Sequence, residues 1–232
     1  MIGIICAMNE ELEEITLLLK DKNYEKFGAF EFITGHINNT KCVVVKCGVG
    51  KVHAAMCTQT LIFKYNPKFI LNIGVAGAID KNINIGDVVI ASGTIQHDFD
   101  ISVFPNRKKG EISGIDAVEI KCTNWVVDKL LECSKKFQNF KTHNGIILTG
   151  DQFINSKTKL LELKNEFGGI ACEMEAGSIA QTCFVNKIDF GIIRAISDNA
   201  DDDSHIDFYS FIKSSSKNNA ILLYEFIKSI QG

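Results

Sequence analysis

The chain has 232 residues, of which 46% are hydrophobic and 23% are charged, and its formal net charge is -3. This length can build one large buried core, and no linker-like stretch divides the sequence, so we expect a single domain over residues 1–232. Nucleic-acid-binding domains carry clustered positive charge, which this composition gives no reason to expect. No apolar run approaches the roughly 20 residues of a membrane helix, so no membrane association is predicted.

Cysteine and glycine patterns bear on compartment and cofactors. The eight cysteines are spread through apolar runs, and the N-terminus lacks the charged start of a signal peptide, so we expect reduced thiols in a cytoplasmic protein. No Cys-x-x-Cys pair occurs, and the His-Asp-Phe-Asp run (97–100) has no partner cluster, so no metal is predicted. Residues 72–77 lack the three-glycine dinucleotide fingerprint, and residues 48–52 lack the full phosphate-binding loop. We therefore expect no cofactor.

The first two predicted elements place an acid inside the protein. Residues 1–7 are apolar and predict a buried strand, and a helix is expected to follow from about residue 9. At about 100° per residue, Glu11 falls within the apolar stripe of this helix, whereas its other acids lie opposite. We therefore expect Glu11 to point inward; the alternative is an edge residue whose carboxylate reaches solvent.

The middle of the chain alternates strands and helices. Residues 24–47 predict hairpins with turns at 35–36 and 38–39, and a glycine turn then leads into a helix over about 51–65. Residues 69–78 are expected to form a buried strand that ends in a loop of small residues. Further strands are expected over residues 85–91 and 144–149, and further helices over about 124–137 and 208–230. This alternation predicts an α/β fold: one domain with a central mixed, mostly parallel twisted sheet flanked by helices.

Two apolar strands near the end of the chain run out into charged residues. Glu173 and Glu175 follow one of them, and Arg194, Ser197 and Asp198 close the next. In α/β sheets the carboxyl ends of strands face the crevice where ligands bind, so these side chains predict one shared pocket. The alternative is a pair of solvated turns with ordinary acids.

Six motifs together carry a resemblance to a known family. They are Met-Asn-Glu-Glu (8–11), Gly-Val-Gly-Lys-Val (48–52), Asn-Ile-Gly-Val-Ala-Gly (72–77), Gly-Asp-Gln-Phe-Ile (150–154), Glu-Met-Glu-Ala (173–176) and Arg-Ala-Ile-Ser-Asp (194–198). In these motifs and in their order the chain resembles the methylthioadenosine/S-adenosylhomocysteine nucleosidases, from its first residue to its final helix. The last two motifs are specific to the nucleoside phosphorylase-like fold, and the first favours its nucleosidase branch.

The resemblance implies hydrolysis of the ribose-to-adenine bond in methylthioadenosine and S-adenosylhomocysteine, with release of adenine and of methylthioribose or S-ribosylhomocysteine. Breaking this bond builds an oxocarbenium-like sugar and an electron-rich purine, so the site must protonate the base and hold anionic groups near the sugar. In the family pattern Asp198 matches the acid that protonates adenine N7, and Glu11 matches the carboxylate that activates water.

The resemblance also implies substrate contacts in a homodimer. Glu175 matches the residue that grips the ribose 2′- and 3′-hydroxyls, Phe153 is expected to stack on adenine, and Arg194 to steady the water and the carboxylates. Val49 is expected to reach the partner subunit's site. The other implied contacts to the nucleoside are Met8, Val75, Ala76, Gly77, Ile154, Met174, Ser197 and Phe208.

Two departures and three alternatives stay open at this point. Val75 stands where many members have Ser, and residues 105–114 do not match the segment that holds the 5′-substituent, so the preference among thioethers is open. The alternatives are a purine nucleoside phosphorylase of the same fold, an aminofutalosine-type nucleosidase, and a nucleoside-binding module without catalysis. The presence of Glu11, Glu175 and Asp198 argues against the last.

Overall fold

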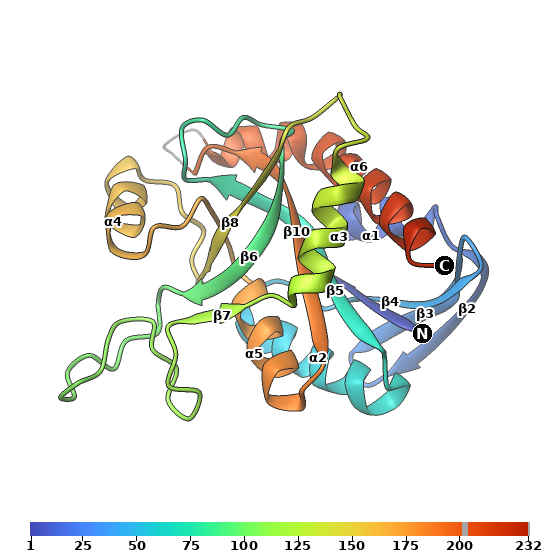
Figure 1. Cartoon of the computed structure of the whole chain (residues 1–232), viewed down its shortest axis with the longest axis horizontal. Coiled ribbons are helices and arrows are strands. Elements are labelled where there is room, and N and C mark those ends of the chain that lie inside the picture. Colours follow the sequence, from blue (N-terminus) through green and yellow to red (C-terminus); the bar gives the residue numbers. More distant parts are fainter. Residues whose placement is uncertain (201–203, 232) are drawn as a thin grey trace.

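Two ten-residue strands, β5 (Phe69–Ala78) and β10 (Asp189–Asp198), pair in parallel through the middle of the molecule (Figure 1). The structure is a computed structural model that describes residues 1–200 and 204–231. Apart from Asp189, every residue of these two strands is buried. Their nearly continuous apolar sequence is typical of parallel strands that are covered on both faces.

The remaining elements surround this central pair. The other strands are β1 (Ile2–Cys6), β2 (Lys20–Phe27), β3 (Phe30–Ile37), β4 (Thr40–Lys46), β6 (Val88–Gln96), β7 (Glu119–Lys121), β8 (Thr142–Thr149) and β9 (Ala171–Glu173). The helices are α1 (Asn9–Thr16), α2 (Lys51–Tyr65), α3 (Asn124–Ser134), α4 (Lys157–Phe167), α5 (Ala176–Asn186) and α6 (Ser204–Ser229).

The strands form one mixed sheet in the order β10-β6-β8-β9-β5-β1-β4-β3-β2. Because β10 also pairs with β5, part of this sheet closes on itself, and β1, β4, β3 and β2 extend from it. The pairings among β4, β1, β5 and β10 are parallel, as are those among β6, β8 and β9, whereas the β2-β3-β4 hairpins are antiparallel. The predicted α/β fold with a central mixed sheet and flanking helices is confirmed.

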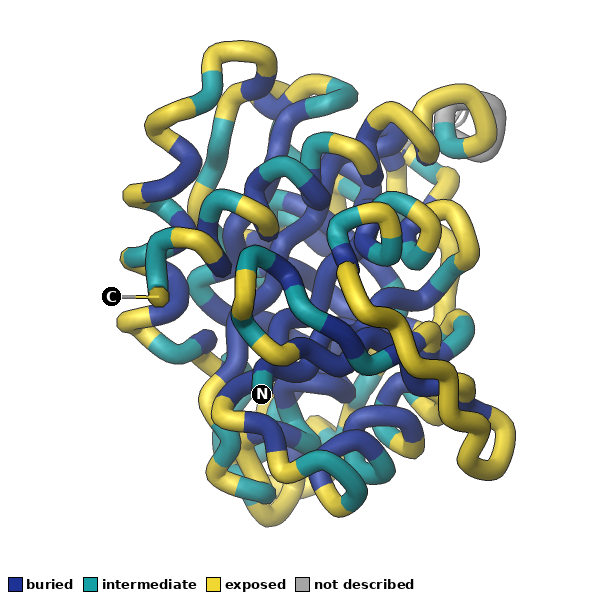
Figure 2. The backbone as a smooth tube through the Cα atoms, turned by 90° about the vertical axis from the view of Figure 1, so that its right-hand side faces the viewer, coloured by how far each residue is buried: buried dark blue, intermediate teal, exposed yellow. Residues whose placement is uncertain are grey.

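Helices cover the sheet on its two sides. Helix α6 packs against β10 and β5 and also contacts α1 and α3, while α2 and α5 pack against each other (Figure 1). The buried residues gather in the interior, and β2 is exposed along its whole length, as the long yellow run across Figure 2 shows. Among the described helices none is long and apolar enough to span a membrane.

Strand β5 changes its neighbour along one edge, and this change creates the site. Residues 70–72 pair with β1, whereas Gly77 and Ala78 pair with β9. Between these segments the edge pairs with neither strand, and the Val75 N–H donates to Glu11 Oε1 at 3.0 Å. The sheet is therefore open here, and a side chain from α1 reaches the main chain of β5.

Several predicted boundaries were wrong. Gly35 and His36 lie inside β3, not in a turn, and a Cβ at Gly35 would come within 2.6 Å of the Lys20 carbonyl oxygen. That glycine therefore allows close packing of β2 instead of a chain reversal. The strand expected at residues 85–91 runs from Val88 to Gln96, and α4 was not predicted at all.

Candidate active site

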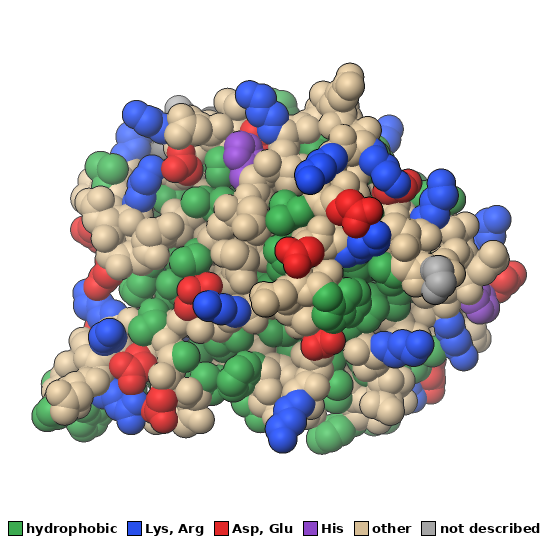
Figure 3. Space-filling model, viewed as in Figure 1, with side chains coloured by type: hydrophobic (Ala, Val, Ile, Leu, Met, Phe, Trp, Pro, Cys, Tyr) green, Lys and Arg blue, Asp and Glu red, His purple; other side chains and the backbone are tan. Residues whose placement is uncertain are grey.

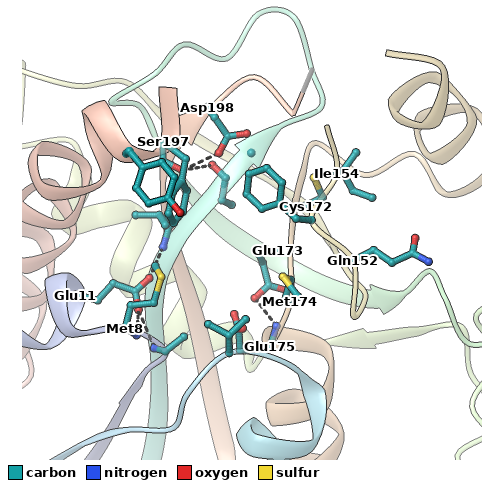
Figure 4. Close-up of a pocket in the computed structure, with 18 residues that line it drawn as sticks. Met8, Glu11, Gln152, Ile154, Cys172, Glu173, Met174, Glu175, Ser197 and Asp198 are labelled. Carbon is teal, nitrogen blue, oxygen red and sulfur yellow. Dashed lines mark hydrogen bonds between the residues drawn. The ribbon is translucent and has the colours of Figure 1, made fainter. Parts of the chain in front are cut away.

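A cavity of about 340 Å³ lies beside the open edge of β5, where the ends of β9 and β10 meet the start of α1 (Figure 4). Except for Arg194, every residue that the sequence analysis expected at the chain's own site lies in its wall, and Val49, which was expected to reach the partner subunit's site, lies in the same wall. The wall consists of Ala7, Met8, Glu11, Val49, Val75, Ala76, Gly77, Gln152, Phe153, Ile154, Cys172, Glu173, Met174, Glu175, Ser197, Asp198, Phe208 and Tyr209.

Glu11 is held by three main-chain N–H groups. Its Oε2 accepts from Ala7 at 2.7 Å and from Met8 at 3.0 Å, and its Oε1 accepts from Val75 at 3.0 Å. Burial raises the pKa of this carboxyl group, and the nearby Arg194 and the three N–H groups offset only part of that rise. The helical phase correctly predicted that Glu11 points inward, since its side chain is buried against the cavity.

Two glycines of β5 leave room for the acids. A Cβ at Gly74 would lie 2.7 Å from Glu11 Oε1 and 2.6 Å from Arg194 Nη1, and one at Gly77 would lie 2.7 Å from Asp198 Oδ1. Real Cβ atoms essentially never approach other atoms closer than 3.0 Å. A side chain at either position would therefore displace a carboxylate that lines the cavity.

Asp198 ends β10 in a buried position. Its Oδ2 accepts from the Ser197 hydroxyl at 2.9 Å, and its Oδ1 accepts from the Ala200 N–H at 2.9 Å. The carboxylate points toward the cavity (Figure 4) and is 3% exposed. These two donors fix its orientation.

An aromatic pair borders the same end of the cavity. The rings of Phe153 and Phe208 pack edge to face, with centroids 5.8 Å apart and an interplanar angle of 87°. Phe153 follows β8 and is 45% exposed, and Phe208 belongs to the first turns of α6. Two residues distant in sequence thus present aromatic surface to a flat ligand.

Arg194, which was expected to steady the water and the carboxylates, lies behind the cavity wall and does not line it. Its Nη2 donates to Glu173 Oε2 and to Asn72 Oδ1, and it is 1% exposed. A buried guanidinium requires a carboxylate partner, and Glu173 supplies it. Arg194 therefore acts on the cavity through its charge and through Glu173.

Glu173 also fixes the start of α5. Its Oε2 accepts from the N–H groups of Glu175 and Ala176 at 3.0 and 2.8 Å, and its Oε1 accepts from the Thr149 hydroxyl. A carboxylate is favourable at a helix N-terminus because the first N–H groups there lack partners within the helix. The sequence analysis placed Glu173 at the end of its strand and assigned it no role at the site.

Glu175 carries an unusual pKa. Its Oε1 accepts from the Gly50 N–H at 2.8 Å, and its side chain is almost completely buried. Burial, together with the negative charge of Glu173, raises the pKa of Glu175 to about 8, although Arg194 and the Gly50 N–H oppose the rise. This carboxyl group is therefore destabilised in its ionised form.

Glu175→Gln is expected to stabilise the empty protein more at about pH 8 than at about pH 5. Because the pKa is raised from 4.5 to about 8, the folded protein keeps a proton that the unfolded chain releases, and stability falls as pH rises through this window. An amide does not titrate and so removes this loss of stability. The increase in the free energy of unfolding caused by the variant should therefore be larger at the higher pH than at the lower by about 1 kcal/mol or more, which corresponds to one unit of pKa shift.

Urea unfolding of both proteins at the two pH values measures this difference. Glu13→Gln, at an exposed position of α1, is the matched control and should behave alike at both. An equal effect of Glu175→Gln at both pH values would contradict the raised pKa.

Four further wall residues were not predicted at the site. Ala7, Gln152, Cys172 and Tyr209 each adjoin a predicted residue in the sequence, which was the available signal. Neither they nor any other described residues form a group of three or more His, Cys, Asp or Glu that could hold a metal ion. The side chains of the wall offer carboxylates, hydroxyls, an amide, a thiol, thioethers and aromatic rings.

Comparison with known proteins agrees with this arrangement. The model of the Phosphorylase superfamily matches residues 1–228. Over 229 aligned residues the chain is 36% identical to the 5′-methylthioadenosine/S-adenosylhomocysteine nucleosidase of Staphylococcus haemolyticus (strain JCSC1435). The alignment covers 98% of this chain and 99% of that relative.

Solved structures give the same result. The nucleosidase of the same name from Neisseria meningitidis, in complex with methylthio-immucillin-A, has a TM-score of 0.95 and 31% identity, with 99% of each chain covered. The futalosine hydrolase of Helicobacter pylori strain 26695 has a TM-score of 0.94 and 31% identity, covering 99% of this chain and 97% of that one. The chain therefore belongs to the 5′-methylthioadenosine/S-adenosylhomocysteine nucleosidase family of the phosphorylase superfamily.

Proposed function

We propose that this protein is an N-glycosyl hydrolase that cleaves the ribose-to-adenine bond of methylthioadenosine and S-adenosylhomocysteine. The products are adenine and methylthioribose or S-ribosylhomocysteine. The observation that carries this proposal is the convergence of Glu11, Glu175 and Asp198 on one cavity that is bordered by an aromatic pair. The names of the relatives support the same reaction.

In the proposed reaction, two carboxyl groups divide the transfer of protons. Asp198 protonates adenine N7 as the glycosidic bond breaks, so that the purine leaves as a neutral base. Glu11 orients a water molecule and takes its proton as the water attacks the anomeric carbon. The Ser197 hydroxyl and the Ala200 N–H keep Asp198 in place for this step.

The other wall residues bind the nucleoside in this proposal. Glu175 accepts hydrogen bonds from the ribose 2′- and 3′-hydroxyls, and Met174 lies beneath the sugar. The adenine ring stacks on Phe153, with Phe208 closing over it. Buried carboxylates near the anomeric carbon stabilise the positive charge that develops on the sugar.

Water, and not phosphate, is expected to be the nucleophile. A phosphorylase must hold a dianion beside the sugar, for which proteins use Arg forks or helix N-termini. Of the two arginines, Arg107 pairs with Glu111 and Asp116, and Arg194, which does not line the cavity, pairs with Glu173. Phosphate next to the Glu11 carboxylate would also be repelled by several kcal/mol in order of magnitude.

Product analysis with methylthioadenosine, with and without phosphate, tests the function directly. Adenine release should proceed at the same rate in phosphate-free buffer and yield the free sugar. A strict requirement for phosphate, with a sugar 1-phosphate as product, would replace the hydrolase by a phosphorylase. No adenine release under either condition would reject both.

A second candidate substrate class differs only at the 5′-position. The similarity to the Helicobacter pylori futalosine hydrolase favours it, together with the departure of residues 105–114 from the family pattern. An aminofutalosine-type nucleoside would undergo cleavage of the same bond by the same acids. Values of kcat/KM for methylthioadenosine and for an aminofutalosine substrate, measured side by side, separate the two classes.

We further propose that the protein is a homodimer. The support is an apolar surface on α2 and α5, two helices that are joined by reciprocal amide hydrogen bonds between Gln59 and Asn186. Exposed apolar patches of this kind commonly mark protein interfaces. The exposed residues on this surface are Val52, Met56, Phe63, Phe184 and Val185, and the half-exposed Val49 connects it with the cavity.

Phe63→Glu is expected to shift the protein toward monomers, because it places a charge in an apolar interface. Sedimentation velocity of the wild type and the variant measures the masses. Lys187→Glu, at the end of α5, is a control for the change in charge. A monomeric wild type at micromolar concentration would reject the dimer.

We also propose a cytoplasmic location. The support is that all eight cysteines are buried and unpaired, as expected of a protein from a reducing compartment. A fusion to a fluorescent protein, or cell fractionation, tests this location.

A further inference from the structure

Three residues outside the cavity wall form a closed ring of hydrogen bonds. Lys51 Nζ donates to Asp98 Oδ1 at 2.6 Å, and the Asp151 N–H donates to Asp98 Oδ2 at 2.9 Å. The Lys51 N–H in turn donates to Asp151 Oδ1 at 2.8 Å. The Lys51–Asp98–Asp151 ring therefore joins the start of α2, the segment after β6 and the segment after β8.

The ring is more than a solvated surface pair. The side chains of Lys51 and Asp98 are only 18% and 19% exposed. Burial raises the pKa of Asp98, but the hydrogen bonds from Lys51 and from the Asp151 N–H outweigh burial and lower it below its usual value. The Lys51 ammonium group pairs with Asp98, and the other two donors of the ring are the main-chain N–H groups of Lys51 and Asp151, so the geometry is fixed by three separate segments.

The ring is connected through Gly50 to Glu175, a residue of the cavity wall. Gly50, directly before Lys51, donates its N–H to Glu175 Oε1 at 2.8 Å. Gly50 has φ of +97°, and a Cβ there would lie 3.1 Å from Asp151 Oδ1. Only a residue without a side chain fits this turn, and the ring fixes the turn from its other side.

We propose that the Lys51–Asp98–Asp151 ring is a positioning device for Glu175. By fixing the Gly50 turn it aims one N–H at Glu175 Oε1, so that the second carboxylate oxygen is held toward the ribose. This inference rests on the proposed function, because it takes the ribose hydroxyls as the ligand of Glu175. None of the three ring residues lines the cavity, so they act through Gly50.

The proposal predicts a particular kinetic signature. The ribose hydroxyls are present in the substrate and in the transition state alike, so a loosened Glu175 weakens both. Such a loss of uniform binding raises KM and leaves kcat nearly unchanged. A ring that served stability alone would lower the midpoint of thermal unfolding and leave the KM of the folded enzyme as it is.

Lys51→Met and Asp151→Ala in the full-length enzyme test this signature with methylthioadenosine. Each should raise KM about tenfold, the effect of losing a hydrogen bond that involves a charged group, with kcat within about twofold of the wild type. Asp151→Asn keeps an oxygen that can accept from the Lys51 N–H, so its KM should lie close to that of the wild type. Lys129→Met is the control, since it removes an exposed Lys–Glu pair on α3, which contributes nothing to the wall.

Coupling to Glu175 is the decisive measurement. If the ring acts through Glu175, then Asp151→Ala should add less than about twofold to the KM of Glu175→Gln, because the carboxylate that it positions is already gone. The proposal would be overturned if the KM increases of Asp151→Ala and Glu175→Gln multiplied in the double variant. It would also be overturned if Lys51→Met and Asp151→Ala each left KM unchanged.

Two controls keep this inference separate from the others. The wild-type assay tests the proposed function by itself. If the wild type hydrolyses methylthioadenosine and the ring variants have its KM, the positioning role of the ring is rejected and the proposed function stands. Thermal unfolding and light scattering on every variant identify the folded protein and its mass. A rise in KM that appears only where the mass changes would assign the ring to subunit assembly and overturn the positioning role.

Discussion

Asp198→Asn is expected to lower kcat by about 10²–10⁴-fold, the usual contribution of a general acid, while the nucleoside still binds. An amide can donate a hydrogen bond to a purine nitrogen, but it cannot transfer a proton at a useful rate. The buried position of Asp198 and its contacts with Ser197 and the Ala200 N–H are the basis of this expectation. Single-turnover kinetics measures the chemical step, and calorimetry with methylthioadenosine measures binding.

Ser197→Ala provides a graded comparison. It removes the hydroxyl that donates to Asp198 Oδ2 but leaves the carboxyl group in place. Its kcat should fall by much less than that of Asp198→Asn. If Asp198→Asn kept a tenth of the wild-type kcat, Asp198 would not be the acid.

Glu11→Gln should give the second large loss, again about 10²–10⁴-fold in kcat, with a smaller change in KM. The variant removes the base that deprotonates water and leaves the ribose and purine contacts unchanged. It should also lower the free energy of unfolding by about 1–3 kcal/mol, because three buried N–H groups bond to two carboxylate oxygens and an amide offers only one.

The two effects of Glu11→Gln are separated by measuring kcat at a temperature where the variant is fully folded. Glu10→Gln is the matched control, since Glu10 precedes it in the same helix and is exposed. A folded Glu11→Gln enzyme with normal kcat would show that this carboxylate only caps α1 and joins it to β5.

Local sequence determined much of the fold and several site residues. Periodicity depends only on neighbouring residues, so the phase of α1 sufficed to turn Glu11 inward. The apolar run from residue 69 predicted β5, although the small residues at its end were expected in a loop and belong to the strand. The acids at the ends of β9 and β10 were predicted to share a pocket at one edge of the sheet. They line one cavity, although the two strands do not pair and run in opposite directions, since β5 is antiparallel to β9 and parallel to β10. The resemblance to a family added the proposed roles of these residues.

Tertiary structure alone decided how the charges are paired. Arg194 was expected to steady the water and the carboxylates, and the sheet places it behind the wall, against the Glu173 carboxylate 21 residues earlier in the chain. The Lys51–Asp98–Asp151 ring likewise joins three segments that no periodicity relates. Whether a buried charge faces a ligand or another charge depends on which strands become neighbours, and that is set by packing over the whole sheet.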